Sequence, residues 1–344
     1  MSPAMISVPL NELEFALLNN WQRGFPLTAR PYQAIAESLG RTETEVMAAY
    51  QRLLASGHIS RVGAVFRPHV LGWSTLAAIR VPAERVEWAA ARINAHPEVN
   101  HNYEREHAWN LWFVVAAASR TDVARVLAEI GHEVGSPVLD LPMVEDYHID
   151  LGFDLNGHRK NNPHRVNHSP ITHPIELNAC DRTICTALEP GLSVTSHPYA
   201  AMAALCQETE ADILERIAHL QDSGVIRRFG VIVRHRELGY TANAMVVWNI
   251  PDARVVEVGH ALGADAAVTL CYQRPRRLPD WPYNLFSMVH GRDREAVLAE
   301  ISRLRTTLGL AETDCVPLFS QRRFKQCGAR YGARHSAGAN QKAA

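Results

Sequence analysis

The segment HNYEREH, residues 101–107, carries side chains suited to acid–base chemistry and anion binding. His101, Tyr103, Arg105 and His107 are spaced two residues apart, and residues with this spacing on a β-strand point to the same face. A buried polar group without a partner costs about 1–3 kcal/mol, so this row does not belong in a dry core. The apolar run that follows it, within 110–118, is typical of a core strand. We therefore expect the row to line a polar cavity, or to face water as a solvated hairpin.

The two halves of the chain repeat one another. Residues 28–40 align with 195–207, and residues 55–73 align with 222–240, both at a constant offset of 167. Such self-similarity predicts two copies of one structural unit.

After small insertions the repeat reaches the polar row. Its register places Tyr272 at the position of Tyr103 and Arg274 at the position of Arg105, whereas Leu270 stands at the position of His101. The row therefore recurs in altered form. We expect either one complete site or two dissimilar sites.

The hydrophobic periodicity changes midway through each half, from helical to mixed. The expected elements of the first half are helices at 10–20, 30–39 and 42–56, a short strand pair within 58–66, a strand at 74–81, a helix at 83–95, a strand pair within 98–116, a helix at 121–134 and a strand at 138–149. Thr42 and Glu45 form a capping box and Gly57 a helix stop. This order predicts a winged helix-turn-helix followed by a β-α-β-β-α-β, ferredoxin-like domain, an α+β fold present twice in tandem.

The expected boundaries follow from this order. They are 10–70 and 175–237 for the two winged helix-turn-helix domains, 71–155 and 238–327 for the two ferredoxin-like domains, 156–174 for a linker rich in Pro, Asn and His, and 328–344 for a disordered tail.

The composition of the 344-residue chain is that of a folded, soluble protein, with 47% hydrophobic and 21% charged residues. A formal net charge of −1 gives no global reason to expect nucleic acid or an anionic membrane as partner. The six cysteines form no CxxC pair, so we expect free thiols, no metal site and no disulfide framework. The first residues do not resemble a signal peptide, and no run of about 18 apolar residues occurs. We expect a cytoplasmic protein.

A winged helix-turn-helix joined to a β-α-β-β-α-β domain resembles the Lrp/AsnC family of bacterial regulators. Three strings are more specific: HNYEREHAWNLWF (101–113), SGVIRRFG (223–230) and CYQRPRRLPDWPYNLFSMVHG (271–291). These strings resemble the sirohaem decarboxylases within that superfamily, and a chain with both subunits end to end is similar to the fused form. The resemblance implies a carboxy-lyase that removes the carboxyls of two acetate side chains of sirohaem, at C12 and C18. Its product would be didecarboxysirohaem, used in haem d1 or alternative haem biosynthesis.

Such a substrate, a flat iron-bearing macrocycle edged with carboxylates, requires cations around a rim, apolar faces and a proton donor. Guanidinium groups bind carboxylates bidentately and stay charged when partly buried. The expected substrate-binding residues are Arg61, Arg105, Asn110, Trp112, Arg228, Arg274, Arg276, Arg277, Trp281, Tyr283, Asn284 and His290. For four of these a structural role stays open. Arg61 and Arg228, with their neighbour Arg227, could form surface ion pairs, and Trp112 could belong to the core. His290 could equally be a structural histidine at a strand end.

Cleavage of a C–CO₂ bond leaves a carbanion, which the macrocycle can delocalise before a side chain protonates the carbon. His101 and His107 titrate nearest neutrality and are the natural general acids. Tyr103 and Tyr272 are expected to donate or to orient. A histidine could instead bind the iron. No organic cofactor or redox partner is required, because the iron belongs to the substrate.

Two other functions fit the fold. A transcriptional regulator would need a basic recognition helix, because DNA affinity comes largely from neutralising phosphates. The candidate helices carry Glu43 and Glu45 in the first half and five acids against Arg216 in the second, so DNA is not an expected partner. A tetrapyrrole sensor would keep the pocket without the chemistry. The expected partners are sirohaem and, beyond it, further decarboxylase subunits or a second copy of the chain, with no membrane.

Overall fold

The computed structural model describes residues 10–149, 177–234, 242–329 and 331. The expected linker at 156–174 lies outside these residues, as does most of the expected tail. The helices are α1 (Glu12–Asn20), α2 (Pro31–Leu39), α3 (Glu43–Ala55), α4 (Val86–Ala95), α5 (Arg120–Val134), α6 (Ala179–Leu188), α7 (Ala200–Cys206), α8 (Glu210–Asp222), α9 (Val255–Ala264) and α10 (Arg294–Thr307). The strands are β1 (Ile59–Phe66), β2 (Trp73–Ile79), β3 (Val99–Arg105), β4 (Leu111–Ala117), β5 (Val138–Pro142), β6 (Glu145–Ile149), β7 (Ile226–Val233), β8 (Ala242–Trp248), β9 (Val268–Gln273), β10 (Leu285–Gly291) and β11 (Cys315–Gln326).

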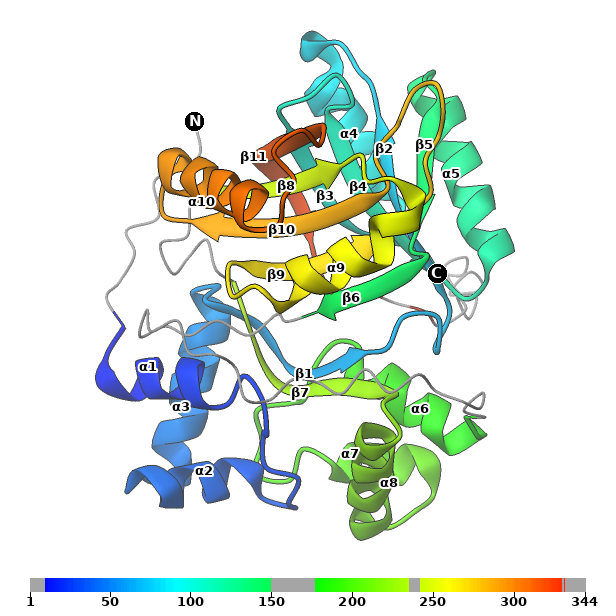
Figure 1. Ribbon diagram of the computed structural model, residues 1–344. Helices are drawn as coiled ribbons and strands as arrows, with labels where there is room; N and C mark the ends of the chain where they lie inside the picture. The colour runs from blue at the N-terminus through cyan, green and yellow to red at the C-terminus, as the bar shows by residue number, and fades with distance from the viewer. Residues whose placement is uncertain (1–9, 150–176, 235–241, 330, 332–344) are drawn as a thin grey trace, which may run out of the picture.

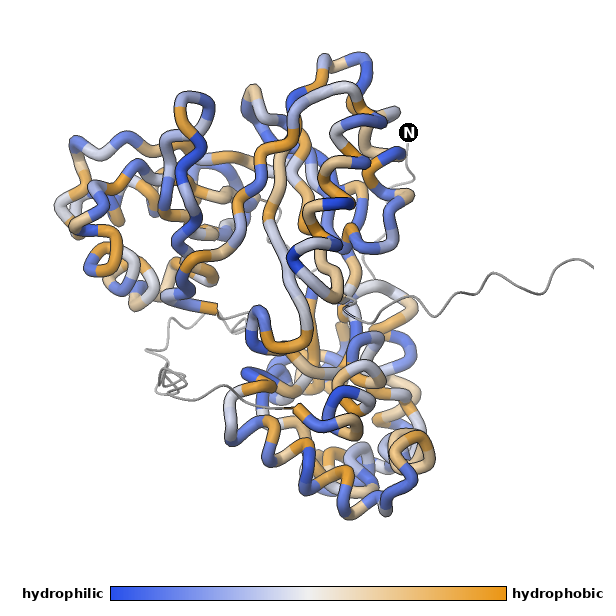
Figure 2. The backbone as a smooth tube through the Cα atoms, turned by 90° about the vertical axis from the view of Figure 1, so that its right-hand side faces the viewer, coloured by the Kyte–Doolittle hydropathy of each residue, from blue (hydrophilic) through white to orange (hydrophobic). Residues whose placement is uncertain are grey.

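The two helix-turn-helix units form one layer with a shared core. The capping box of Thr42 and Glu45 starts α3, as predicted, and Gly57 follows its end with a φ of +78°. Each unit also bonds the other, because the Tyr32 hydroxyl donates to the Ser193 carbonyl at 3.0 Å and the Tyr199 hydroxyl to the Pro26 carbonyl at 3.4 Å. Figure 1 shows this layer below the sheets, and Figure 2 shows the same layer from the side.

The wings differ from the expectation of a strand pair within 58–66. That stretch forms one strand, β1, which pairs antiparallel with β7 of the second half. Each wing therefore satisfies its backbone hydrogen bonds with the other wing, and the resulting two-stranded ribbon lies between the helical layer and the large sheet (Figure 1).

The two ferredoxin-like units share one nine-stranded sheet with the order β5-β2-β4-β3-β11-β8-β10-β9-β6. Within each half the β-α-β-β-α-β order is as predicted, with α4 and α5 packed on the first four strands and α9 and α10 on the second four. The tandem α+β architecture is confirmed.

The last strand of each half crosses to the other half. The stretch 138–149, expected as one strand, is two: β5 pairs with β2, and β6 pairs with β9 of the second half. Correspondingly, β11 pairs with β8 along its first part and with β3 along its second. Tyr147 of β6 consequently lies in the apolar core of the second half, and Phe324 of β11 packs against that of the first.

An aromatic cluster joins the inner faces of the two half-sheets. It contains Ala78, Trp109, Trp112, Leu139, Leu141, Met245, Val247, Trp281, Tyr283, Phe286 and Leu318. This inner cluster is separate from the cores under the helices. The two halves are thus held together by apolar burial as well as by strand exchange. Among the described helices, none combines the length and the apolar character needed to cross a membrane.

Candidate active site

The polar row on β3 exists, but it is shorter than predicted. Asn102 points toward α4, where its amide nitrogen donates to the Ala90 carbonyl at 3.3 Å. His101, Tyr103 and Arg105 alternate with Asn102 and therefore share the opposite face, toward the wing ribbon and the inner cluster.

His107 is not part of this row, which corrects the expectation, because β3 ends at Arg105. Its Nδ1 accepts the backbone N–H of Trp109 at 3.0 Å, and its ring stands edge-on to Trp281 with centroids 5.6 Å apart. His107 thus packs on the aromatic cluster from the β3–β4 loop.

Four residues, Arg61, His101, Tyr103 and Arg105, define what we call site A. The His101 and Tyr103 rings are stacked with centroids 6.2 Å apart, and the Arg105 guanidinium carbon lies 5.7 Å from the Tyr103 ring centroid. Burial, followed by the nearby charge of Arg61, lowers the pKa of His101 to about 4. At neutral pH the imidazole is therefore uncharged, and its Nδ1 lies 2.7 Å from Oδ1 of Asn100.

Site B is the repeat-related counterpart, formed by Arg227, Tyr272, Arg274 and Asp146. Both terminal nitrogens of Arg227 bond the carboxylate of Asp146, one of them at 3.1 Å. Asp146 sits opposite Tyr272 in the β6–β9 pairing, and the guanidinium carbon of Arg274 lies 5.3 Å from the Tyr272 ring centroid. Burial raises the pKa of Tyr272, so its phenol is protonated and able to donate.

A β-bulge in each wing strand turns arginine toward these sites. The β1–β7 register skips one residue after Ile59 and one after Ile226. Because a bulge adds a residue on one strand, Ile59 and Ile226 face the helical core while Arg61 and Arg228 are left on the sheet side. Arg228 is buried there.

Two arginines reach across the halves in equivalent ways. Nη1 of Arg105 donates to the Leu318 carbonyl at 2.9 Å, and Nη1 of Arg274 donates to the Leu141 carbonyl at 2.5 Å. Burial lowers the pKa of each to about 10, so both stay cationic at neutral pH. In each the Nε–H is buried without an acceptor among the described residues.

His290 belongs to the same level of the sheet as Arg105. Arg105 pairs with Ser320 of β11, and the preceding residue of β11, Phe319, pairs with Ala244 of β8. Asn243, the neighbour of Ala244, pairs with His290 of β10. His290 alternates with Val289 of the second-half core and so shares the inner face with Phe286 of the aromatic cluster. In the sheet order, strands β11 and β8 lie between His290 on β10 and site A on β3.

The other expected binding residues have structural partners. Trp112, Trp281 and Tyr283 are at most 9% exposed and pack against one another in the aromatic cluster. The Asn110 amide bonds both the N–H and the carbonyl of Val81, and the Asn284 amide does the same with Ile250. These two asparagines pin the hairpins that carry Arg105 and Arg274, whose backbone N–H groups bond their carbonyls at 2.9 Å.

Arg276 and Arg277 are also engaged. Arg276 bonds Asp252 and, at 3.0 Å, Oδ1 of Asn249. Nε of Arg277 donates to the Asp140 carbonyl at 2.8 Å. Arg276 thus ties the β9–β10 loop to the segment that follows β8, and Arg277 ties it to β5.

Asp146 of site B and the neighbouring His69 were not among the expected residues. His69 and Asp146 are far from the polar strings in sequence, and only the strand exchange of β6 brings Asp146 to Tyr272. The row of alternating polar residues in 145–149 was a weak signal for the latter. No repeated motif marked His69.

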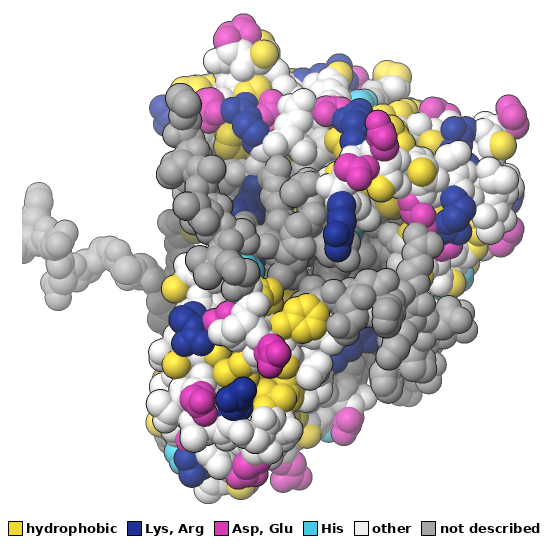
Figure 3. Space-filling view, turned by 90° about the vertical axis from the view of Figure 1, so that its left-hand side faces the viewer, with side chains coloured by type: hydrophobic (Ala, Val, Ile, Leu, Met, Phe, Trp, Pro, Cys, Tyr) yellow, Lys and Arg dark blue, Asp and Glu magenta, His cyan; other side chains and the backbone are white. Residues whose placement is uncertain are grey.

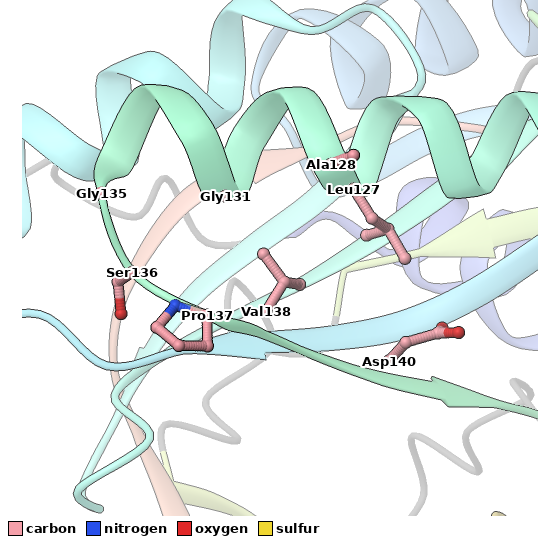
Figure 4. Close-up of a pocket in the computed structure, with 8 residues that line it drawn as sticks. All are labelled: Leu127, Ala128, Gly131, Gly135, Ser136, Pro137, Val138 and Asp140. Atoms are coloured by element: carbon pink, nitrogen blue, oxygen red, sulfur yellow. The ribbon is translucent and has the colours of Figure 1, made fainter.

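A surface groove between α5 and β5 lies on the helix-covered side of the sheet, away from both sites. Figure 4 shows its lining, which is small and mostly apolar: Leu127, Ala128, Gly131, Gly135, Ser136, Pro137, Val138 and Asp140. None of the expected site residues is among them.

Comparison with known proteins identifies the relatives of both domain types. Residues 70–148 and 237–325 match the AsnC-like ligand binding domain, and residues 14–59 and 181–227 match the siroheme decarboxylase NirDL-like HTH domain. The chain is 42% identical over 326 residues to the siroheme decarboxylase NirDL subunit of Paracoccus denitrificans (strain Pd 1222), an alignment that covers 93% of this chain and 97% of that one.

Solved structures agree with the sequence comparison. The crystal structure of the siroheme decarboxylase NirDL is similar over 94% of this chain and 95% of that chain, with 25% identity and a TM-score of 0.66. NirDL in co-complex with an iron-uroporphyrin III analogue is similar over 93% of both chains, with 25% identity and a TM-score of 0.64. Both domain types matched twice, together with the 42% identical relative, show that this chain belongs to the NirDL-like family of sirohaem decarboxylases.

Proposed function

We propose that this chain decarboxylates sirohaem, removing the carboxyls of the C12 and C18 acetates to give didecarboxysirohaem. One observation carries the proposal: Arg105 and Arg274 are cationic, stand beside a tyrosine at repeat-related positions, and each keeps a buried Nε–H without an acceptor among the described residues. Leaving a buried donor unpaired is costly. A carboxylate of the tetrapyrrole would supply the acceptor, and the family membership supports the same substrate.

For each acetate, the reaction requires only that the protein binds the substrate and supplies one proton. As the bond between the acetate methylene and the carboxyl carbon breaks, its electron pair stays on the methylene carbon and CO₂ leaves. The macrocycle delocalises that charge, and a proton from the protein converts the methylene to a methyl group. His101 is the proposed donor in site A, with the Tyr103 ring stacked against it.

A neutral His101 must gain its proton before it can donate one. Its pKa of about 4 applies to a site with the Arg61 charge nearby. A bound carboxylate brings the opposite charge, which favours the imidazolium. We infer that substrate binding raises the pKa of His101 and so favours its protonated form.

The arginines select which carboxylates stay. A carboxylate held by a guanidinium is stabilised as the anion and so resists losing CO₂. Arg61, Arg105, Arg228 and Arg274 are therefore proposed to hold retained side chains, while the reacting acetates lie nearer the imidazoles. His290 and Tyr272 complete the proposed set.

No separate cofactor takes part in this scheme, since the iron is part of the substrate. The six cysteines are free thiols, in keeping with the reducing cytoplasm that we propose as the compartment. Further decarboxylase subunits or a second copy of the chain are proposed partners.

A regulator that reads DNA is not proposed. Helix α8 carries Glu210, Asp212, Glu215 and Asp222 against Arg216. On the face shown in Figure 3, acidic and basic side chains are interspersed over the helical layer, without a basic patch. Both features oppose the phosphate neutralisation that DNA binding needs.

The test is an anaerobic incubation of the purified chain with sirohaem, followed by mass analysis of the extracted tetrapyrrole. Loss of two CO₂ units is the expected result. Sirohaem that stays bound but intact would instead indicate a tetrapyrrole sensor, and sirohaem that does not bind would overturn the proposal.

A further inference from the structure

The two sites differ in their imidazoles. Site A has His101 on β3. The repeat register puts Leu270 in place of His101 in site B. The second set of repeat positions thus retains an arginine and a tyrosine but not this proton donor.

His69 restores an imidazole to site B from a different element, the β1–β2 loop. Partial burial lowers the pKa of its imidazole. A hydrogen bond with the backbone of Met143, at the bend between β5 and β6, raises this pKa, the nearby charge of Arg274 lowers it, and that of Asp146 raises it. Met143 lies two residues from Leu141, whose carbonyl accepts from Arg274. The His69 ring also packs on Trp73, with centroids 4.1 Å apart.

The backbone at His69 is held in an uncommon conformation. Its φ is +64°, in the left-handed region that non-glycine residues seldom adopt. Such positions are strained and cluster where function requires a particular side-chain direction. The His69 side chain is nonetheless exposed, so water can return a proton to it after each turnover.

We propose that His69 is the proton donor of site B, so that the chain holds two unlike decarboxylation sites with one donor each, His101 in site A and His69 in site B. This inference rests on the proposed function. In site B the bond to the carboxyl carbon of one acetate breaks, CO₂ leaves, and the electron pair on the methylene carbon takes the proton from the His69 imidazolium. Solvent then reprotonates the ring. No oxidant or reductant is consumed.

The test compares H69N with H101N in single-turnover anaerobic incubations with sirohaem. Mass analysis counts the CO₂ units lost, and reversed-phase chromatography separates the two mono-decarboxylated products, which are isomers of equal mass. Asparagine tolerates a positive φ and its amide can still bond Met143, but it cannot deliver a proton. The wild type should lose two CO₂ units. Each variant should slow one loss by about 100-fold or more, and the two should stall at different tetrapyrroles. Added imidazole should restore the slowed loss in H69N.

The control for the backbone is Q207N, because Gln207 also has a positive φ, of 56°, at the end of α7, far from both sites. It should give the wild-type product ratio. If H69N also gives that ratio, or if H69N and H101N slow both losses equally, His69 is not a separate donor. A wild type that leaves sirohaem intact would instead refute the proposed function itself.

Discussion

At the scale of single residues, the shifted pKa of His101 lowers the free energy of unfolding at acidic pH. Its pKa falls from 6.5 in the unfolded chain to about 4 in the folded one. Between these values the unfolded chain binds the proton and the folded chain does not, so the free energy of unfolding decreases as the pH falls through this window. The shift corresponds to at most about 3 kcal/mol.

We therefore expect H101Q to lose less stability than the wild type between pH 6.5 and pH 4. Glutamine can keep a hydrogen bond near Asn100 but has no proton to gain. Urea unfolding of both proteins at the two pH values measures the difference. Equal losses in both proteins would mean that His101 is not buried as described.

Substitutions of Arg274 and Arg276 can show which of the two guanidinium groups binds the substrate. Replacing Arg274 with Gln should weaken sirohaem binding by about 10- to 150-fold, the value of a hydrogen bond to a charged group. Replacing Arg276 with Gln should weaken it less than threefold, since that guanidinium already bonds Asp252 and Asn249. Anaerobic titration followed by absorbance gives both affinities. A larger effect at Arg276 would place it in the site after all.

At the scale of elements, each wing strand packs on a loop from the other half. The Val231 N–H donates to the Trp21 carbonyl at 2.8 Å, and the Leu192 N–H donates to the Val62 carbonyl at 2.6 Å. Glycine in each strand permits this approach: a Cβ on Gly230 would lie 2.5 Å from the Trp21 carbonyl oxygen, whereas a Cβ on Gly63 would lie 3.3 Å from its nearest neighbour.

These repeat-related glycines give a matched pair of substitutions. Gly230→Ala should lower the free energy of unfolding by about 2 kcal/mol or more, because the clash is with backbone that cannot move aside. Gly63→Ala should cost clearly less. Denaturant unfolding of the two variants measures the contrast, and similar costs would show that the loop at Trp21 yields easily.

At the scale of the whole molecule, the chain is a covalently joined pair whose halves exchange strands. β6 pairs with the second half-sheet, and β11 pairs with the first. The aromatic cluster buries apolar side chains from the inner faces of both. Most of the stabilising burial between the halves therefore does not depend on the connection through 150–176.

Two separate chains, residues 1–155 and 175–344, should accordingly assemble into one stable complex when produced together. Each alone would expose the inner cluster and an unpaired edge of β3 or β9, so it should aggregate. Light scattering after size-exclusion chromatography distinguishes these outcomes. A stable, monomeric half would contradict the exchanged sheet.

The sequence by itself determined the repeat, the α+β order of each half, and the row of His101, Tyr103 and Arg105, because periodicity and repetition are local properties that the backbone must obey. It did not determine the pairing of β1 with β7, the break between β5 and β6, or the departure of His107 from the row.

Tertiary structure decided those features, because strand exchange pairs segments from different halves and the local sequence of a strand does not specify which strand it pairs with. It also decided which arginine donors are engaged by carbonyls and carboxylates and which have no acceptor among the described residues. For the same reason His69, more than 70 residues from any other member of site B, reaches Arg274 only through the fold.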